Sequence, residues 1–97
     1  MPKNIVIPIQ VNKESIAMCE FPAEDVLNAK DKEALVLLLE NATKLGNMEH
    51  SKIKIVFEDS DAVKQVETTV WATTDKRVVL KGGIVIPINR IHQIVLV

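Results

Sequence analysis

The fold is decided in Val78-Val-Leu-Lys-Gly-Gly-Ile-Val-Ile-Pro-Ile-Asn-Arg-Ile-His-Gln-Ile-Val-Leu-Val97, at the carboxy-terminal end of the 97-residue chain. Two β-rich runs meet there at Gly82-Gly83, and a polar break at Asn89-Arg90 precedes a final strand. Paired glycines suit a two-residue type I′ hairpin turn, because both accept a positive φ angle at little cost. This order of parts predicts the closing strands of a small, strongly bent β-structure.

The glycine turn also predicts a register for the hairpin. It pairs Leu80 with Val85 and Val79 with Ile86, and opposed residues of antiparallel strands share a face. Both faces of the hairpin are then apolar, which is unusual for an antiparallel sheet with water on one side. We therefore expect one face in the interior and the other under a helix or a partner subunit. The last strand, up to Val97, is expected to be covered on both sides as well.

One helix is predicted over residues 31–45. Asp31 is a suitable N-cap, and Gly46-Asn47 is a typical stop signal after the last turn. Leucine and alanine residues fall on one stripe, while Val36 and Leu37 broaden the apolar surface. The helix is therefore expected to be covered on more than one side. A short helical turn is expected before it, at residues 22–29.

The amino-terminal residues allow two interpretations. Residues 5–11 have strand composition, but Pro8 cannot donate to a central ladder position, so we expect an edge strand. Residues 15–21 form either a second strand or a short helix, and we favour the hairpin.

Alternation with a period of two begins after His50 and predicts strands over residues 52–57, 66–73 and 77–81. The predicted fold class is α+β, with one main helix packed on a small five-stranded, strongly bent antiparallel sheet or SH3-like barrel. An N-terminal strand or hairpin extends this fold. The length fits a single domain, residues 1–97. Its expected parts are an N-terminal extension (1–21), a helical part (22–46) and a barrel-like β segment (51–97).

Residues 51–97 resemble the SH3-like and Sm-like small barrels. The pattern Val78-Val-Leu-x-x-Gly-x-x-Ile-Pro-Ile-x-Arg-Ile-x-x-Ile94 is similar to that of small bacterial barrels that bind the transcription terminator Rho, and of uncharacterised bacterial barrels like them. The resemblance implies a binding module. Two departures limit what it implies. Lys81 stands where Sm proteins carry arginine before glycine, and the segment is mildly basic where Rho-binding barrels are acidic.

Charge and cysteine content exclude several classes of protein. The formal net charge is −1, so the protein lacks the excess of positive charge that is typical of a general nucleic-acid binder. Residues 1–63 carry 7 Lys/Arg and 11 Asp/Glu, a net of −4, whereas residues 64–97 carry 5 and 2, a net of +3. Cys19 is the only cysteine, so an internal disulfide is impossible and a reducing, cytoplasmic location is expected. No apolar run approaches the ~20 residues that span a bilayer.

No catalytic, metal or cofactor site is predicted. His50 and His92 lack the cysteine or carboxylate spacing of a metal site. The run Glu58-Asp-Ser-Asp61 is interpreted as a solvated turn, because it lacks the pattern of a calcium loop. Cys19 has no activating base nearby in sequence and is expected to be a buried, inert thiol. No phosphate loop or nucleophile motif occurs, so we expect no enzymatic activity and no small-molecule substrate.

Trp71 is the most informative single residue. Alternation along residues 66–73 places it opposite the more apolar strand face, where an exposed tryptophan would anchor a partner. We favour the alternative, in which the leucine stripe of the helix covers it. Cations near it in sequence could form a basic rim for an acidic partner or a phosphate backbone. The candidate binding surface comprises Trp71, Lys76, Arg77, Lys81, Arg90 and His92.

Two functions of different classes are compatible with these features. The first, which we favour, is a non-catalytic protein-interaction or regulatory module that binds a protein partner or a second copy of itself. The alternative is a nucleic-acid-binding small barrel, in which the basic rim contacts phosphate and Trp71 stacks on a base.

Overall fold

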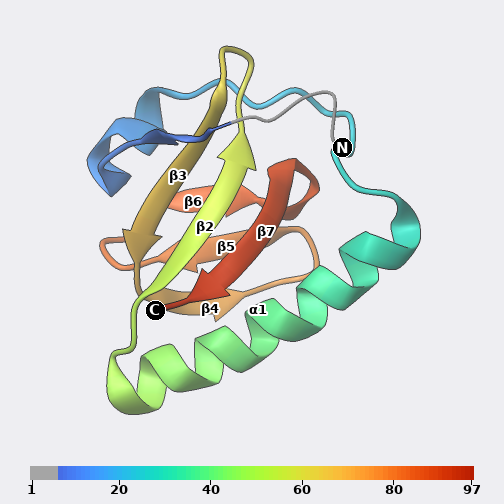
Figure 1. Cartoon of the computed structure of the whole chain (residues 1–97). Coiled ribbons are helices and arrows are strands. Elements are labelled where there is room, and N and C mark those ends of the chain that lie inside the picture. Colours follow the sequence, from blue (N-terminus) through green and yellow to red (C-terminus); the bar gives the residue numbers. More distant parts are fainter. Residues whose placement is uncertain (1–6) are drawn as a thin grey trace.

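The computed structural model describes residues 7–97 and has the predicted α+β fold, with one long helix and two β-sheets (Figure 1). In chain order the elements are β1 (Ile9–Gln10), the 3-10 helix η1 (Lys13–Met18), α1 (Ala29–Glu49), β2 (Ile53–Glu58), β3 (Val63–Thr68), β4 (Val70–Thr73), β5 (Arg77–Leu80), β6 (Val85–Pro87), the 3-10 helix η2 (Ile88–Arg90) and β7 (Ile91–Leu96). Sheet A has the strand order β1-β3-β2-β7, and sheet B has the order β4-β5-β6.

The predicted five-stranded sheet or closed barrel is wrong. The expected strand over residues 66–73 breaks at Thr69, so that its halves, β3 and β4, belong to different sheets. Thr69 itself is buried, and its hydroxyl donates a 3.4 Å hydrogen bond to the carbonyl of His50. The chain therefore forms a four-stranded and a three-stranded sheet, whose strands run in different directions around one core (Figure 1).

The helices α1 and η1 each lie where an edge of sheet B approaches sheet A. The helix α1 contacts β4 and β7, whereas η1 contacts β3 and β6. Apolar side chains from the two sheets and both helices form a single cluster between them, because burial of aliphatic area is the main source of folding free energy. Its least exposed members are Phe57, Leu39, Ile53, Ile55, Val78, Leu80, Ile86, Ile88 and Ile91.

The helix is longer than predicted at both ends. Its N-cap is Asn28, whose side-chain oxygen accepts a 2.8 Å hydrogen bond from the backbone N–H of Asp31, so Asp31 lies in the first turn. Gly46 does not end the helix, which runs to Glu49 and is capped by His50 at a φ of 54°. The glycine serves packing instead, because a Cβ at that position would collide with the carbonyl oxygen of Val70 on β4.

The amino-terminal part contains a 3-10 helix in place of the favoured hairpin. β1 is an edge strand, as Pro8 predicts, but it pairs in parallel with β3. Residues 13–18 form η1, and its Ile16 is buried in the core. The expected helical turn at residues 22–29 is wrong, since residues 22–28 are irregular. Residues 5 and 6 of the expected first strand lie outside the described residues.

The hairpin register differs from the prediction by one residue. The turn spans three residues, Lys81 to Gly83, because the N–H of Leu80 donates to the carbonyl of Ile84 at 2.7 Å. Both glycines have a positive φ, 91° at Gly82 and 83° at Gly83. Val78 consequently pairs with Ile86, and Val79 with Val85.

This one-residue shift separates the hairpin into a buried face and an outer face. Val78, Leu80 and Ile86 point inward and are fully buried, so the prediction that both faces are covered is wrong. The same correction holds for the last strand, where Val95 is 45% exposed and Leu96 is 60% exposed. The outer residues of sheet B are therefore available to a partner.

Candidate functional site

The outer face of sheet B is apolar and uncovered. Val79 lies opposite Val85, and Arg77 lies opposite Pro87, on the side away from the buried residues of β5 and β6. Val85 is 39% exposed, and Arg77 is exposed. An antiparallel sheet with one side in water normally carries polar residues on that side. Exposed aliphatic residues in this position therefore need a specific explanation.

A bulge in β4 adds the tryptophan to this face. Val70 pairs with Leu80 and Ala72 pairs with Val79, so Trp71 is an extra residue between two ladder pairs. Bulges re-aim side chains and are common next to binding sites. Ala72 shares the outer face with Val79, and the adjacent Trp71 is 47% exposed.

The expectation that the helix covers Trp71 is wrong. The buried stripe of α1 packs against the inner side of β4, where the hydroxyl oxygens of Thr43 and Thr73 lie 2.6 Å apart. Trp71 itself is 47% exposed, so the helix does not bury it. We call this outer surface the Trp71 face. Its members are Trp71, Ala72, Arg77, Val79, Val85 and Pro87.

Three cations lie on or beside the Trp71 face. Lys76 and Arg77 are held at one end of β5 by a tight turn, in which the hydroxyl of Thr74 accepts hydrogen bonds from both of their N–H groups, at 3.2 and 3.0 Å. Lys81 lies at the other end, where its N–H donates to the carbonyl of Thr69 at 2.9 Å. Within residues 7–97 none of these three side chains forms an ion pair. Their charges are free to act on a partner.

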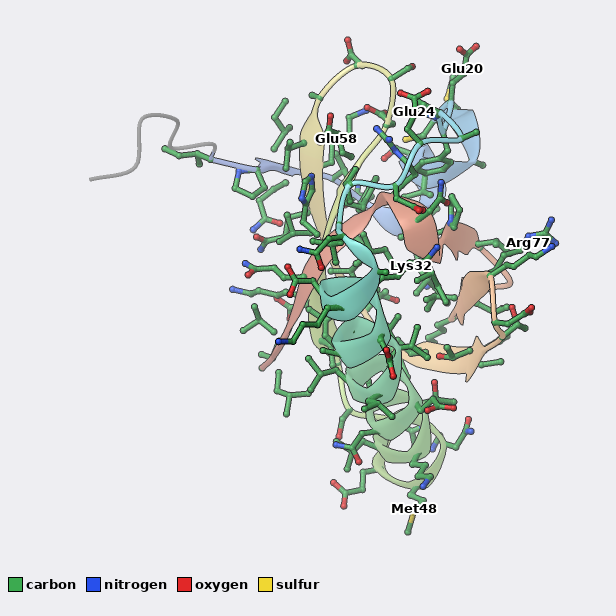
Figure 2. The ribbon with its side chains drawn as sticks, turned by 90° about the vertical axis from the view of Figure 1, so that its right-hand side faces the viewer. Glu20, Glu24, Lys32, Met48, Glu58 and Arg77 are labelled. Carbon is green, nitrogen blue, oxygen red and sulfur yellow. The ribbon has the colours of Figure 1, made fainter. Side chains whose placement is uncertain are left out.

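Figure 2 shows Arg77 pointing away from the body of the molecule. A hollow of about 530 Å³ adjoins this end of the face and is lined partly by Lys76, Arg77 and Pro87. Lys32, also in its lining, is engaged by Asp25 at 3.1 Å. The hollow gives the basic end of the Trp71 face a concave part.

Arg90, a predicted surface residue, is instead buried at 5% exposure. Its Nε donates to the carbonyl of Glu58 at 3.0 Å, and its Nη1 donates to the carbonyl of Glu24 at 2.8 Å. Its Nη2 lies 3.8 Å from the Glu58 carboxylate. Glu24 and Glu58 accordingly lie near each other in Figure 2. Arg90 ties the irregular segment before α1 to the end of β2, and we assign it a structural role.

Asn89 supports the same connection. Its side-chain amide donates to the carbonyl of Ala23 at 2.8 Å, and its own carbonyl accepts from the N–H of Val26 at 2.9 Å. The polar break before the last strand therefore fastens residues 23–26 to η2. In the sequence, Asn89 and Arg90 were visible only as a polar break between two β-rich runs, and nothing there indicated a contact with residues 23–26.

His92 is also separate from the Trp71 face. It lies on β7 of sheet A, and its Nε2 is 2.8 Å from a carboxylate oxygen of Glu58. Arg90 and His92 thus share one acidic partner, Glu58, at the end of β2 in sheet A. Of the six predicted surface residues, the structure gathers Trp71, Lys76, Arg77 and Lys81 around sheet B and places the other two elsewhere.

A buried ion pair was missed in the sequence, where the run after β2 was interpreted as a solvated turn. Asp59 is 4% exposed, and its Oδ2 accepts a 2.6 Å hydrogen bond from Nζ of Lys64. Its Oδ1 accepts from the N–H groups of Asp61 and Ala62, at 2.9 and 2.8 Å. An aspartate that begins a turn before a strand, with lysine five residues later, is the signal that could have found it.

The environment of this pair sets the pKa values of its members. Burial disfavours the Asp59 carboxylate, but hydrogen bonds from Lys64 and from the turn N–H groups outweigh it and hold the pKa of Asp59 well below its usual range. The hydrogen bond to Asp59 raises the pKa of Lys64. Burial raises the pKa of the Cys19 thiol, whose Sγ lies 3.9 Å from Nζ of Lys64. A raised pKa disfavours the reactive thiolate.

Within the described part of the chain, no three His, Cys, Asp or Glu residues are grouped in a way that could hold a metal ion. None of the helices there is both long and apolar enough to cross a bilayer. Comparisons with protein-family models, with curated proteins and with solved structures gave no match.

Proposed function

We propose that this protein is a non-catalytic interaction module, and that its Trp71 face binds an acidic protein segment carrying apolar side chains. One observation supports the proposal above all: the outer side of sheet B is aliphatic and uncovered, with a bulged, half-exposed tryptophan at its edge. Contiguous exposed apolar surface with a polar rim is typical of protein-binding sites, and tryptophan is a frequent anchor.

The charges favour an acidic partner over a second copy of the chain. Arg77 lies on the Trp71 face itself, with Lys76 and Lys81 at its two ends. Two such faces packed together would bring these cations near one another, and like charges across an interface cost several kcal/mol. Carboxylates on a partner would instead complement them and steer its approach.

The composition of the face favours protein over nucleic acid. Single-stranded nucleic acids usually stack on several aromatic side chains within a basic groove, whereas this face offers one tryptophan among aliphatic residues. The net charge of −1 also gives the chain no general attraction for phosphate. The single cysteine suits a module that works in the reducing cytoplasm.

A peptide titration followed by NMR tests this proposal. The probe is an acidic peptide that alternates aspartate or glutamate with leucine and phenylalanine, and the control is the same peptide with lysine at the acidic positions. We expect the acidic peptide alone to shift the amide signals of residues 71–72, 77–80 and 85–87. Trp71→Ala should weaken its binding about tenfold or more, because anchor tryptophans are worth about 2 kcal/mol.

Val95→Ala is the matched control, since Val95 on sheet A is 45% exposed, close to the 47% of Trp71. It should bind the acidic peptide as the natural protein does. Equal affinity for the acidic and basic peptides would contradict the proposal. Binding of single-stranded RNA through Trp71, with no response to either peptide, would show that the face serves nucleic acid instead.

A further inference from the structure

A second candidate site lies at the Lys81 end of the molecule, around a polar hollow of about 370 Å³. Four segments that are far apart in sequence line it: the chain around the start of η1, the approach to β2, the end of β3 with Thr69, and the turn between β5 and β6. The first, second and fourth of these segments each contribute one lysine to the lining, namely Lys13, Lys52 and Lys81. The volume is within the range of small-molecule sites, roughly 300–1,000 Å³.

The three lysines are brought together without neutralisation. None of them forms an ion pair in the part of the chain that the structure describes. The Lys13 side chain lies against the turn at Gly82, where its Nζ is 3.9 Å from the position of a Cβ. Lys81 begins the same turn. Gathering three positive charges costs free energy, which the two carboxylates of the same lining offset in part and a bound anion would offset further.

The base of the hollow is polar and firmly held. Thr68 and Thr69 line it and are both only 5% exposed. Thr69 is fixed through its carbonyl, which accepts the N–H of Lys81, and through its hydroxyl, which donates to His50. The Thr68 hydroxyl makes no hydrogen bond within residues 7–97 while lining the hollow, so it is available to a ligand.

Two carboxylates distinguish this hollow from a simple anion site. Glu14 and Glu67 also line it, so the hollow has acceptors for hydroxyl groups beside the cations. Glu67 lies directly opposite Lys54 in the pairing of β2 with β3, and the positive charge of Lys54 reduces the repulsion between the Glu67 carboxylate and a bound anion. Lysine ammonium groups bind phosphate, and ionised carboxylates accept strong hydrogen bonds from hydroxyls. A ligand that carries both groups satisfies both sets of side chains.

We propose that this hollow binds a small phosphorylated sugar, with the phosphate group on Lys13, Lys52 and Lys81 and the sugar hydroxyls on Glu14 and Glu67. This site is independent of the Trp71 face, apart from the position of Lys81 between the two. The ligand is small, because a hollow of about 370 Å³ has room for one phosphate group and a sugar rather than a continuous backbone.

Isothermal titration calorimetry and NMR with ribose 5-phosphate, inorganic phosphate and ribose as probes test the proposal. The whole chain is used, in sodium chloride of matched ionic strength. We expect ribose 5-phosphate to bind most tightly and to shift the amide signals of Lys13, Thr68, Thr69 and Lys81. Lys13→Ala and Lys52→Ala should each weaken it about tenfold, since a hydrogen bond to a charged group contributes at least about 1.5 kcal/mol.

Lys44→Ala is the control for the loss of one positive charge, because Lys44 is an exposed lysine of α1 that does not line the hollow. It should retain the natural affinity, and so should Trp71→Ala, which separates this site from the proposed function. Equal binding of inorganic phosphate and ribose 5-phosphate would overturn the sugar assignment. Responses no larger than those to sodium chloride, or unchanged binding in Lys13→Ala and Lys52→Ala, would overturn the site.

Discussion

The outer faces of the two sheets differ in what they present to water. On sheet A, Lys54 pairs with Glu67 and Val95, and Val56, between Gln65 and Gln93, is only 7% exposed, so polar side chains make up most of these two rows. On sheet B, the corresponding positions hold the aliphatic residues and tryptophan of the Trp71 face. Both sheets bury their inner faces in the same core. This contrast in the central rows of the two sheets is one reason why we propose sheet B, and not sheet A, as the partner-binding side.

The largest expected difference is in stability, between an arginine that is buried in the fold and an arginine on the Trp71 face. Arg90→Ala removes a buried side chain that donates to two backbone carbonyls and is expected to destabilise the fold by about 3 kcal/mol. Arg77→Ala, on the Trp71 face, should change the free energy of unfolding by less than about 0.5 kcal/mol. Urea denaturation measures both. Similar losses for the two variants would mean that Arg77 also has a structural role.

Polar substitutions on the outer face of sheet B should have the next largest effect. They should weaken the binding of the acidic peptide and leave the stability of the fold unchanged. Val79→Thr with Val85→Thr keeps β-branched side chains but makes the Trp71 face polar. We expect the affinity for the acidic peptide to fall about tenfold, because the apolar contact area is lost. Trp71 is the only tryptophan, so a blue shift of its fluorescence on peptide binding reports the loss directly. Replacement of the exposed Val95 by threonine on sheet A should leave the affinity unchanged.

Gly46→Ala tests how the helix positions the bulge on β4. The added Cβ would collide with the Val70 carbonyl, so the helix must move away. Overpacking costs about 1–3 kcal/mol, from which the better helix propensity of alanine recovers roughly 1 kcal/mol. We expect a net loss of about 1 kcal/mol and a change in Trp71 fluorescence. Asn47→Ala, at an exposed position in the same turn, serves as the control and should cause neither.

The buried pair at Asp59 should stabilise the fold at neutral pH and lose this contribution in acid. The folded-state pKa of Asp59 lies below its ordinary value of 3.8, so the carboxylate stabilises the fold above that pH. This contribution is lost as the pH falls from 3.8 toward the lower folded-state value. Asp59→Asn should flatten the decline of thermal stability over that range. An equal flattening by Asp61→Asn, at an exposed position, would assign the effect to general surface charge.

Local patterns in the sequence predicted the elements better than their arrangement. Alternation located β2 and the hairpin strands, and the leucine-rich run located α1. Asp31 and Gly46 were misassigned, because the residue that caps the helix lies three positions earlier and the glycine is required by a contact with a distant strand. The break at Thr69 was missed, since continuous β-branched composition hides a change of sheet.

The candidate site was predictable in part for the same reason. Lys76, Arg77 and Lys81 are close to Trp71 along one hairpin, so proximity in sequence carried over into proximity in space. The prediction that Arg90 belongs to the binding surface was wrong, because its partners are the carbonyls of Glu24 and Glu58. No local sequence pattern shows that such a contact will form. The three-lysine hollow joins residues 13, 52 and 81, and was likewise invisible.

By itself, the sequence determined the α+β class, the aliphatic core, the helix and the glycine-containing hairpin, because propensity and periodicity act over a few neighbouring residues. The tertiary structure alone decided the hairpin register, the division into two sheets, and the exposure of Trp71. A shift of one residue in register moves every side chain of a strand to its other face. Packing of distant elements selects among such registers, and here it leaves sheet B with an uncovered apolar face.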